Sequence, residues 1–160
     1  MRKKIRRIVI MSIFFMFFGN INTFSQGSNE ELINYELSHN NYIISLPENY
    51  KISINDPRMD FIVYYFNFYE ETHGGIYFGN HPSSINTTGE KITTIKSMLL
   101  GILRNWDIYH RNNKYYTEII IDNIGGNAWE QKMNIWIIGT TINDIENMLF
   151  YYTTIRRENN

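Results

Sequence analysis

The feature that most limits what this chain can fold into is the run Phe61–Tyr69, in which every residue except Asn67 is apolar or aromatic. A strand of this composition must be covered over most of both faces, because apolar surface is unfavourable in water. We therefore expect Phe61–Tyr69 to be a central strand of a sheet. His73-Gly74-Gly75 is expected to turn the chain, so that Ile76–Phe78 returns as the hairpin partner.

Four other segments have the β-branched and aromatic composition of strands. They are Tyr42–Leu46, Tyr50–Ile54, Tyr115–Ile121 and Glu130–Ile138. The first two flank a turn at Pro47, and Gly125-Gly126-Asn127 separates the last two. Their short connections favour a mostly antiparallel sheet.

The last element is expected to be an amphipathic helix packed on one face of this sheet. Its apolar positions recur every three to four residues, at Ile142, Ile145, Met148 or Leu149, Tyr152 and Ile155. Asn143 or Asp144 would begin the helix. Arg156 and Arg157 would lie in its last turn, beside the negative end of the helix dipole.

The segment Glu90–Trp106 fits either a helix or strands. Its apolar residues fall on one helical face, and Thr87 with Glu90 could form a capping box. Its β-branched residues and Gly101 favour strands instead. The predicted fold is therefore α+β, a mostly antiparallel sheet with a C-terminal helix, and a second helix around 90–105 is the open alternative.

Residues 1–25 have the composition of a cleavable secretory signal. Basic residues in positions 2 to 7 precede the apolar run Ile8–Phe18, and small and polar residues follow. The apolar run is about a dozen residues long, against the roughly 20 that a membrane-spanning helix needs. Cleavage after Ser25 would release a single domain, residues 26–160, to the periplasm or the exterior.

Removing the signal leaves an acidic chain. Five of the 15 Lys and Arg lie in positions 2 to 7, so ten remain against 16 Asp and Glu, and the net charge becomes −6. This charge disfavours binding to phosphate backbones, so we expect no nucleic acid partner, and it allows a basic protein partner. The absence of cysteine excludes disulfides, a lipoprotein cleavage site, thiol nucleophiles and thiolate metal sites.

Polar side chains gather at the two ends of the expected hairpin. Glu70, Glu71 and His73 follow the aromatic strand, and Asn80 and His81 follow its partner. Carboxylate and imidazole groups could bind a metal or transfer protons if they converged. A short strand of about three residues, roughly 10 Å, separates the two histidines. A solvated hairpin end or a recognition loop is therefore expected, and no catalytic residue, metal or cofactor is predicted, since the common motifs are absent.

The aromatic residues are the second candidate for binding. Three tryptophans and twelve tyrosines could form a platform for sugars or proteins, or they could fill the core. We expect Trp136 in the core. Trp129, beside the glycine turn, is a candidate contact residue.

Four segments together resemble a known group of proteins. They are Ile44-Ser45-Leu46-Pro47, the aromatic strand from Phe61, the return Ile76–Pro82, and Met133–Ile137 followed by the final helix. Their order resembles small exported bacterial α+β domains of the PsbP and Mog1 group, including immunity-like proteins of type VI secretion. The resemblance implies a scaffold that binds protein and is not catalytic, and it implies no particular binding residue.

These observations rank three functions. The leading expectation is an exported, non-catalytic protein-binding domain. Its narrower form is a periplasmic immunity protein that blocks a basic effector directed at the cell wall. The alternative is an envelope accessory or glycan-binding domain. A small hydrolase with Glu70, His73 or His81 in its site is third.

Overall fold

The computed structural model describes residues 31–37, 41–55, 60–69, 71–85, 89–125 and 131–158. The chain divides into two compact units, Met1–Glu30 and Glu31–Asn160, and the fold described here is that of the second. The predicted signal, Glu70 and Trp129 lie outside the described residues.

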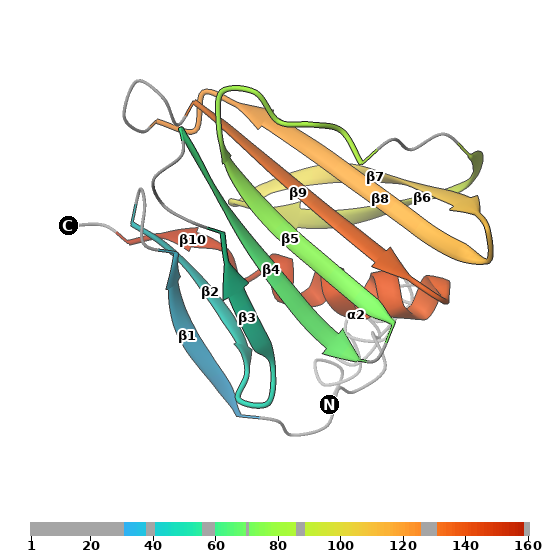
Figure 1. Ribbon diagram of the computed structural model, residues 1–160, viewed down its shortest axis with the longest axis horizontal. Coiled ribbons are helices and arrows are strands. Elements are labelled where there is room, and N and C mark those ends of the chain that lie inside the picture. The colour runs from blue at the N-terminus through green and yellow to red at the C-terminus, as the bar shows by residue number, and fades with distance from the viewer. Residues whose placement is uncertain are drawn as a thin grey trace, which may run out of the picture. The chain divides into compact units, whose positions relative to one another are not determined.

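The unit is built from two antiparallel sheets and one helix within the described residues (Figure 1). The larger sheet has seven strands in the order β3 (Lys51–Ile54), β4 (Phe61–Tyr69), β5 (Thr72–Gly79), β9 (Lys132–Gly139), β8 (Lys114–Asp122), β7 (Ile102–Arg111) and β6 (Glu90–Leu99). The smaller sheet has the order β1 (Leu32–Leu37), β2 (Tyr42–Pro47) and β10 (Arg156–Arg157), and the helix is α2 (Ile142–Tyr152).

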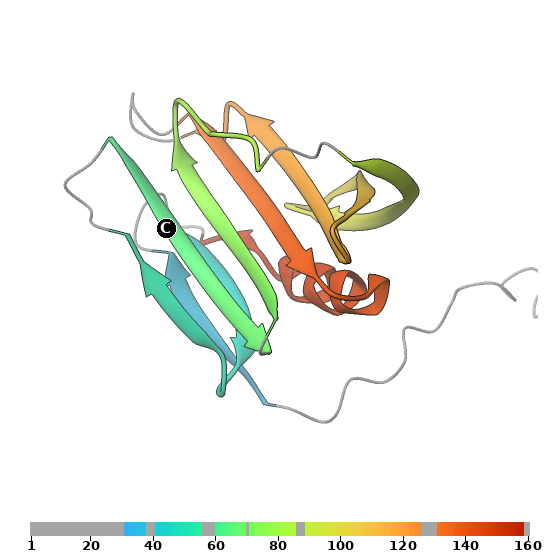
Figure 2. The ribbon, with the colours of Figure 1, turned by 45° about the vertical axis from the view of Figure 1, so that its right-hand side comes forward.

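The core lies on one face of the seven-stranded sheet. Ile62, Tyr64 and Phe66 point to this face from β4 and are 0–1% exposed. Tyr42 of β2 stacks on Phe78 of β5 with ring centroids 5.7 Å apart, so the small sheet packs on the same face. Figure 1 shows α2 behind the sheet near the ends of β5 and β9, and Figure 2 shows the same arrangement from a second side. Covering each such side chain contributes roughly 1.5–3 kcal/mol.

The α+β assignment is wrong, because the unit is mostly β, and the second helix that the sequence left open around 90–105 is absent from this segment. This segment forms the hairpin β6–β7, whose turn is Leu100-Gly101 with φ of 52° and 74°. A right-handed helix cannot accommodate those angles. Because successive side chains of a strand point to opposite faces, every second residue of the hairpin faces the core. Ile95 and Trp106 pair on this core side, and Trp106 is fully buried.

The predicted turn at His73-Gly74-Gly75 is also wrong, since all three residues lie inside β5. The two glycines are there because the neighbouring elements approach the strand closely. A Cβ on Gly74 would collide with the Tyr152 hydroxyl of α2, and a Cβ on Gly75 would collide with the Trp136 ring of β9. Glycine in a strand can mark such a close approach as well as a turn.

The C-terminal helix is present but shorter than expected. Thr141 and Asp144 form its capping box, in which the Thr141 hydroxyl accepts from the Asp144 amide and the carboxylate accepts from the Thr141 amide at 2.8 Å. The helix ends at Tyr152, and Arg156 and Arg157 form β10 beside β2 instead of the last helical turn. The Tyr152 hydroxyl donates to the Trp136 carbonyl at 3.2 Å, and burial raises the pKa of Tyr152 well above its usual value.

Candidate functional site

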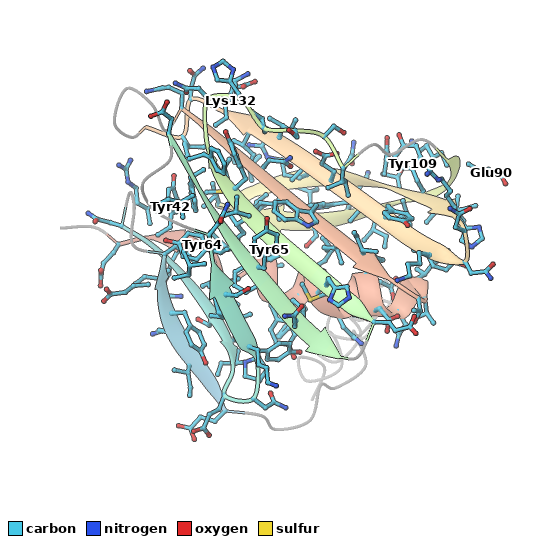
Figure 3. All side chains as sticks on the ribbon, in the orientation of Figure 1. Tyr42, Tyr64, Tyr65, Glu90, Tyr109 and Lys132 are labelled. Carbon is cyan, nitrogen blue, oxygen red and sulfur yellow. The ribbon has the colours of Figure 1, made fainter. Side chains whose placement is uncertain are left out.

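The face of the seven-stranded sheet that points away from α2, hereafter the open face, carries the best candidate site. Its middle row crosses four strands in register: Tyr65 pairs with Gly75, Gly75 with Trp136, and Trp136 with Glu118. Tyr65 is 43% exposed, and Figure 3 shows it on the viewer's side of β4 and β5. The aromatic strand is therefore covered on its core face but only partly on its open face.

Tyr65 and Trp136 form an aromatic pair on a floor made by Gly75. Their rings meet edge to face, with centroids 6.0 Å apart and planes at 72°. The six-membered part of the Trp136 indole occupies the space that a Cβ of Gly75 would need. A glycine at this position lets the indole lie against the backbone of β5, which leaves a broad apolar surface between β4 and β9. Trp136 is thus partly exposed on the open face, and the expectation that it belongs to the core is wrong.

A second aromatic pair extends this surface toward the end of β5. The rings of Phe61 and Tyr77 stack with centroids 5.5 Å apart and planes at 25°. Tyr77 bends over Gly79, whose Cβ position it fills, and its hydroxyl accepts from the His81 amide at 3.1 Å. Tyr77 is only 9% exposed, so this pair supports the surface more than it offers contact area.

Hydrogen bonds to Glu118 of β8 hold the segment that follows β5 against the open face. The Glu118 carboxylate accepts from the Ser84 hydroxyl at 2.7 Å, from the Ile85 amide at 3.2 Å and from the Asn134 side-chain amide at 2.7 Å. Asn134, which is 1% exposed, also reaches the Ser83 carbonyl at 3.4 Å. Three donors on one carboxylate make charge-assisted hydrogen bonds, which are stronger than neutral ones. Glu118 therefore positions a loop rather than offering a reactive group.

The predicted site residues do not come together. Glu71 and His73 lie at one end of β5, and Asn80 and His81 lie at the other. Because β5 is 8 residues long, about 26 Å separate His73 from His81, not the short distance expected from a three-residue strand. These residues cannot form one catalytic or metal site.

Two of the predicted residues make local side-chain hydrogen bonds in the described part of the chain. Nδ1 of His73 is 3.0 Å from the Asn67 side-chain oxygen on the neighbouring strand. The Asn80 side chain accepts from the Gln131 amide at 3.2 Å, which ties the start of the loop to β9. His81 and Glu71 are exposed. Nothing is described for Glu70 or Trp129, so their role stays a prediction.

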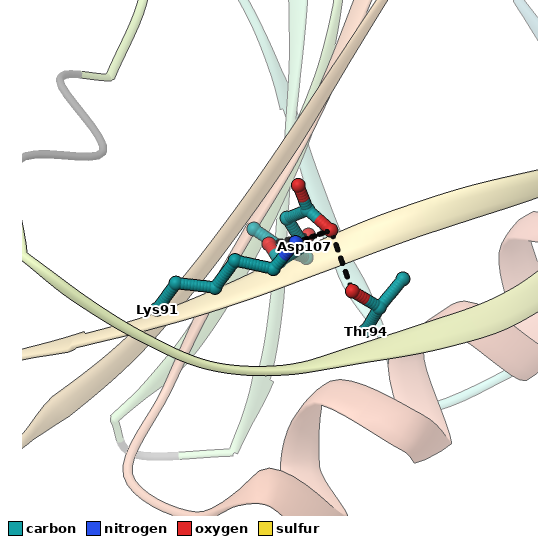
Figure 4. Close-up of polar contacts among 4 residues, drawn as sticks. Lys91, Thr94 and Asp107 are labelled. Carbon is teal, nitrogen blue, oxygen red and sulfur yellow. Dashed lines mark hydrogen bonds and ion pairs between the residues drawn. The ribbon is translucent and has the colours of Figure 1, made fainter.

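The hairpin β6–β7 carries a separate polar cluster on its outer side. Lys91 Nζ lies 2.7 Å from Asp107 Oδ1, and the Thr94 hydroxyl donates to the same oxygen at 2.7 Å (Figure 4). The hydrogen bonds from Lys91 and Thr94 lower the pKa of Asp107. With side chains 48% and 41% exposed, this is a surface ion pair, which contributes little to stability.

The described residues offer little of what a substrate pocket or a metal site would need. The pocket between α2 and the ends of β4 and β5 has a volume of about 10 Å³, the space of about one water molecule. No group of three or more His, Asp or Glu in the described ranges could hold a metal ion. None of the described helical segments is long and apolar enough to cross a membrane.

No protein family, curated protein or solved structure matches this chain significantly. The resemblance to the PsbP and Mog1 group therefore stays a prediction, and the function rests on the geometry of the open face.

The sequence analysis missed Tyr65, Trp136 and Glu118 as parts of one surface. The period of two in Phe61, Val63 and Tyr65 places them on one face of β4. Only the register of β5, β9 and β8 shows which side chains continue that row. The signal that could have indicated an open face is the polar residue inside an apolar strand, Asn134 in β9 and Glu118 in β8.

Proposed function

We propose that this chain is an exported, non-catalytic protein-binding domain whose partner sits on the open face. The observation that carries the proposal is the Tyr65–Trp136 pair on its glycine floor. Aromatic side chains that are half exposed and rigidly supported supply much of the binding energy of protein interfaces. Tyr65 is supported by Trp136, and Trp136 by the backbone of β5, so both rings are ordered before a partner arrives, which lowers the entropic cost of binding.

A protein partner fits this surface better than a glycan. A flat platform for sugars would present aromatic rings that are nearly coplanar, and the planes of the Tyr65 and Trp136 rings cross at 72°. The more nearly parallel pair, Phe61 and Tyr77, is mostly covered at Tyr77. The Glu118 carboxylate, which lies in the same row, already accepts hydrogen bonds from Ser84, Ile85 and Asn134, so most of its acceptor capacity is used within the domain.

The narrower proposal is an immunity role against a basic effector. The chain after residue 25 has a net charge of −6, and opposite charge would accelerate the encounter with a basic partner at low salt. Such a domain would block its partner by covering the active-site cleft with the open face. This would require no catalytic group on the chain itself.

The test is partner capture with a matched pair of variants. Residues 26–160 serve as bait for envelope and secreted proteins, and the affinity of each captured protein is measured for the parent chain, Tyr65→Ala and the control Phe150→Ala. Phe150 is 49% exposed on α2, away from the open face. We expect Tyr65→Ala to weaken binding by about 30-fold or more and Phe150→Ala to leave it unchanged.

The outcomes separate the alternatives. A partner bound equally well by Tyr65→Ala would refute the open face as the binding surface. Competition by soluble cell-wall oligosaccharides, with no protein captured, would favour the glycan-binding alternative. A captured basic hydrolase that loses activity on binding, and regains it with Tyr65→Ala, would support the immunity role.

A further inference from the structure

The tip of the hairpin β6–β7 is apolar and exposed, and it is far from the open-face pair in the strand order. Met98 pairs with Leu103, and Leu99 pairs with Ile102 beside the Leu100-Gly101 turn. Met98, Ile102 and Leu103 are 44%, 54% and 60% exposed. Met98 and Leu103 therefore project into solvent from the outer side of the hairpin end, and Ile102 projects from its other side, beside the turn.

Packing against the core explains only some of the apolar residues at the tip of β6–β7. Leu99 is fully buried and Leu100 packs against the core, so these two residues fix the tip to the unit. Met98, Ile102 and Leu103 have no such role. Another tight hairpin of the same sheet, between β7 and β8, turns at Asn112-Asn113 with φ of 51° and 59°, where the residues are polar as turns favour. The tip of β6–β7 is thus apolar beyond what its fold requires.

The chain that forms this hairpin end carries basic residues and no acidic ones, whereas the domain as a whole is acidic. No acidic residue occurs between Lys91 and Trp106, and this stretch contains Lys91, Lys96 and Arg104. Lys96 is exposed and lies two residues behind Met98 on the same side of β6, about 7 Å away. Lys91 is engaged by Asp107 farther along the hairpin. An exposed basic side chain therefore stands directly behind the aliphatic tip.

From this arrangement we infer that the tip of β6–β7 is a contact site for the surface of an anionic lipid bilayer. Aliphatic side chains can enter the boundary between headgroups and acyl chains while Lys96 stays at the headgroups. The ladder between β6 and β7 runs to the Leu99–Ile102 pair, so entry would leave few backbone groups unpaired. The contact is reversible, because three aliphatic groups and one exposed lysine provide weak binding.

A lipid surface suits this tip better than a protein partner. A stable protein interface buries roughly 800 Å² on each side and is enriched in Trp, Tyr and Arg. The convex end of a two-stranded hairpin offers Met98, Ile102 and Leu103 instead. Insertion into lipid needs neither a large area nor a complementary shape. This inference does not depend on the proposed role of the open face.

Vesicle binding tests the inference with the chain from residue 26, which contains the whole compact unit Glu31–Asn160. Large vesicles of phosphatidylcholine alone, or with about a third phosphatidylglycerol, are sedimented with the protein at low and high salt. We expect binding to the anionic vesicles that weakens in high salt. The double change Ile102→Ser with Leu103→Ser should lower the partition coefficient about tenfold or more, and Lys96→Gln about fivefold.

Two controls keep the test specific. Ile120→Ser with Phe150→Ser removes side chains of similar exposure elsewhere, 43% and 49%, and should leave vesicle binding unchanged. Because the chain has no cysteine, Ile102→Cys and Ile120→Cys can each carry one polarity-sensitive dye. The dye should shift to the blue on anionic vesicles at position 102 only.

Three results would overturn the inference. They are no binding to either vesicle, equal binding by the tip double variant, and a dye shift at position 120 as large as at 102. Concentration-dependent self-association that the tip variant abolishes, without any lipid binding, would also overturn it and assign the tip to contact between copies. Partner capture through Tyr65 should be the same in the tip variant, which separates this test from that of the proposed function.

Discussion

Both faces of the seven-stranded sheet carry aromatic side chains, but their surroundings differ. On the core face, Tyr64 and Phe66 are 0–1% exposed beneath the small sheet and α2. On the open face, Tyr65, which lies between them in sequence, is 43% exposed beside Trp136. The loop residues Ser84 and Ile85 are held at Glu118 of β8. An apolar strand therefore does not imply that both of its faces are buried.

This difference in exposure implies that core-face side chains stabilise the fold, whereas open-face side chains are available for binding. Core-face side chains contribute through burial and close packing, whose loss leaves a cavity. Open-face rings already contact water, so their removal costs little folding energy, and their apolar area remains available for a partner. Pairs of adjacent residues that point to opposite faces allow this comparison to be tested within one strand.

The largest difference is expected between Phe66→Ala and Tyr65→Ala. Phe66 is fully buried, and its truncation should lower the free energy of unfolding by about 3–5 kcal/mol. Tyr65→Ala should lower it by about 1 kcal/mol or less, since the side chain is half exposed. Urea unfolding followed by circular dichroism measures both. Equal losses would mean that the open face is packed as tightly as the core.

Adjacent glycines of β5 provide the second comparison. Gly74→Ala places a methyl group against the Tyr152 hydroxyl and Met148 of the core, so the expected loss is about 1–3 kcal/mol. Gly75→Ala displaces Trp136 on the open face, where the indole can move toward solvent. It should change stability less and should alter the near-ultraviolet circular dichroism and weaken partner binding. The reverse order of stabilities would contradict the assignment of the two faces.

The capping of α2, which closes the core face, has a pH dependence. Burial would raise the pKa of Asp144, but hydrogen bonds from Thr140 and Thr141 outweigh it, and the pKa is lowered from 3.8. Since the folded-state pKa is depressed, this stabilisation is present above the unfolded-state pKa and is lost as pH falls through the folded-state pKa. Asp144→Asn should cost about 1 kcal/mol at neutral pH.

Unfolding midpoints between about pH 6 and pH 2 measure this effect. Asp144→Asn should lose less stability on acidification than the parent chain, so that the two curves converge at the acidic end. The matched control is Asp122→Asn, whose side chain is 63% exposed and pairs with Lys132 at 3.3 Å. Its unfolding midpoints should stay close to those of the parent chain throughout, because an exposed ion pair contributes little to stability. Parallel curves for Asp144→Asn and the parent would show that the cap does not stabilise α2 through its charge.

The smallest effect is expected on the outer side of the hairpin β6–β7. Lys91 and Asp107 are a surface pair with side chains 48% and 41% exposed, so the coupling between them should be about 0.5 kcal/mol or less. A double-mutant cycle with Lys91→Gln and Asp107→Asn measures it, and high salt should reduce it further. A coupling above about 2 kcal/mol would mean that this side of the hairpin is not open to water.

Several strands were predictable because the period of two is local. Phe61–Tyr69 is β4 as predicted, and the strand predicted at Tyr115–Ile121 lies within β8. The segment 90–105 could not be decided, because its apolar positions fit both periods and only the pairing of Ile95 with Trp106 selects the strand. The strands β2 and β3 are consecutive but belong to different sheets. No local pattern specifies that separation.

The candidate site was the least predictable part. His73 and His81 are close in sequence, and their distance depends on whether Gly74 and Gly75 turn the chain or continue the strand. The strand continues through these glycines because Tyr152 and Trp136, which are distant in sequence, occupy the space beside them. Glycine composition alone is compatible with both outcomes.

The sequence by itself determined the strand periodicity of β4 and β8, the amphipathic helix α2 and the acidic charge of residues 26–160, because each depends on neighbouring residues or on composition alone. Only the tertiary structure decided which faces are covered. Tyr65 and Phe66 are both aromatic and are adjacent in sequence, yet Tyr65 contacts water and Phe66 is buried in the core. Burial depends on where distant elements pack, and those contacts arise from the register and order of all seven strands.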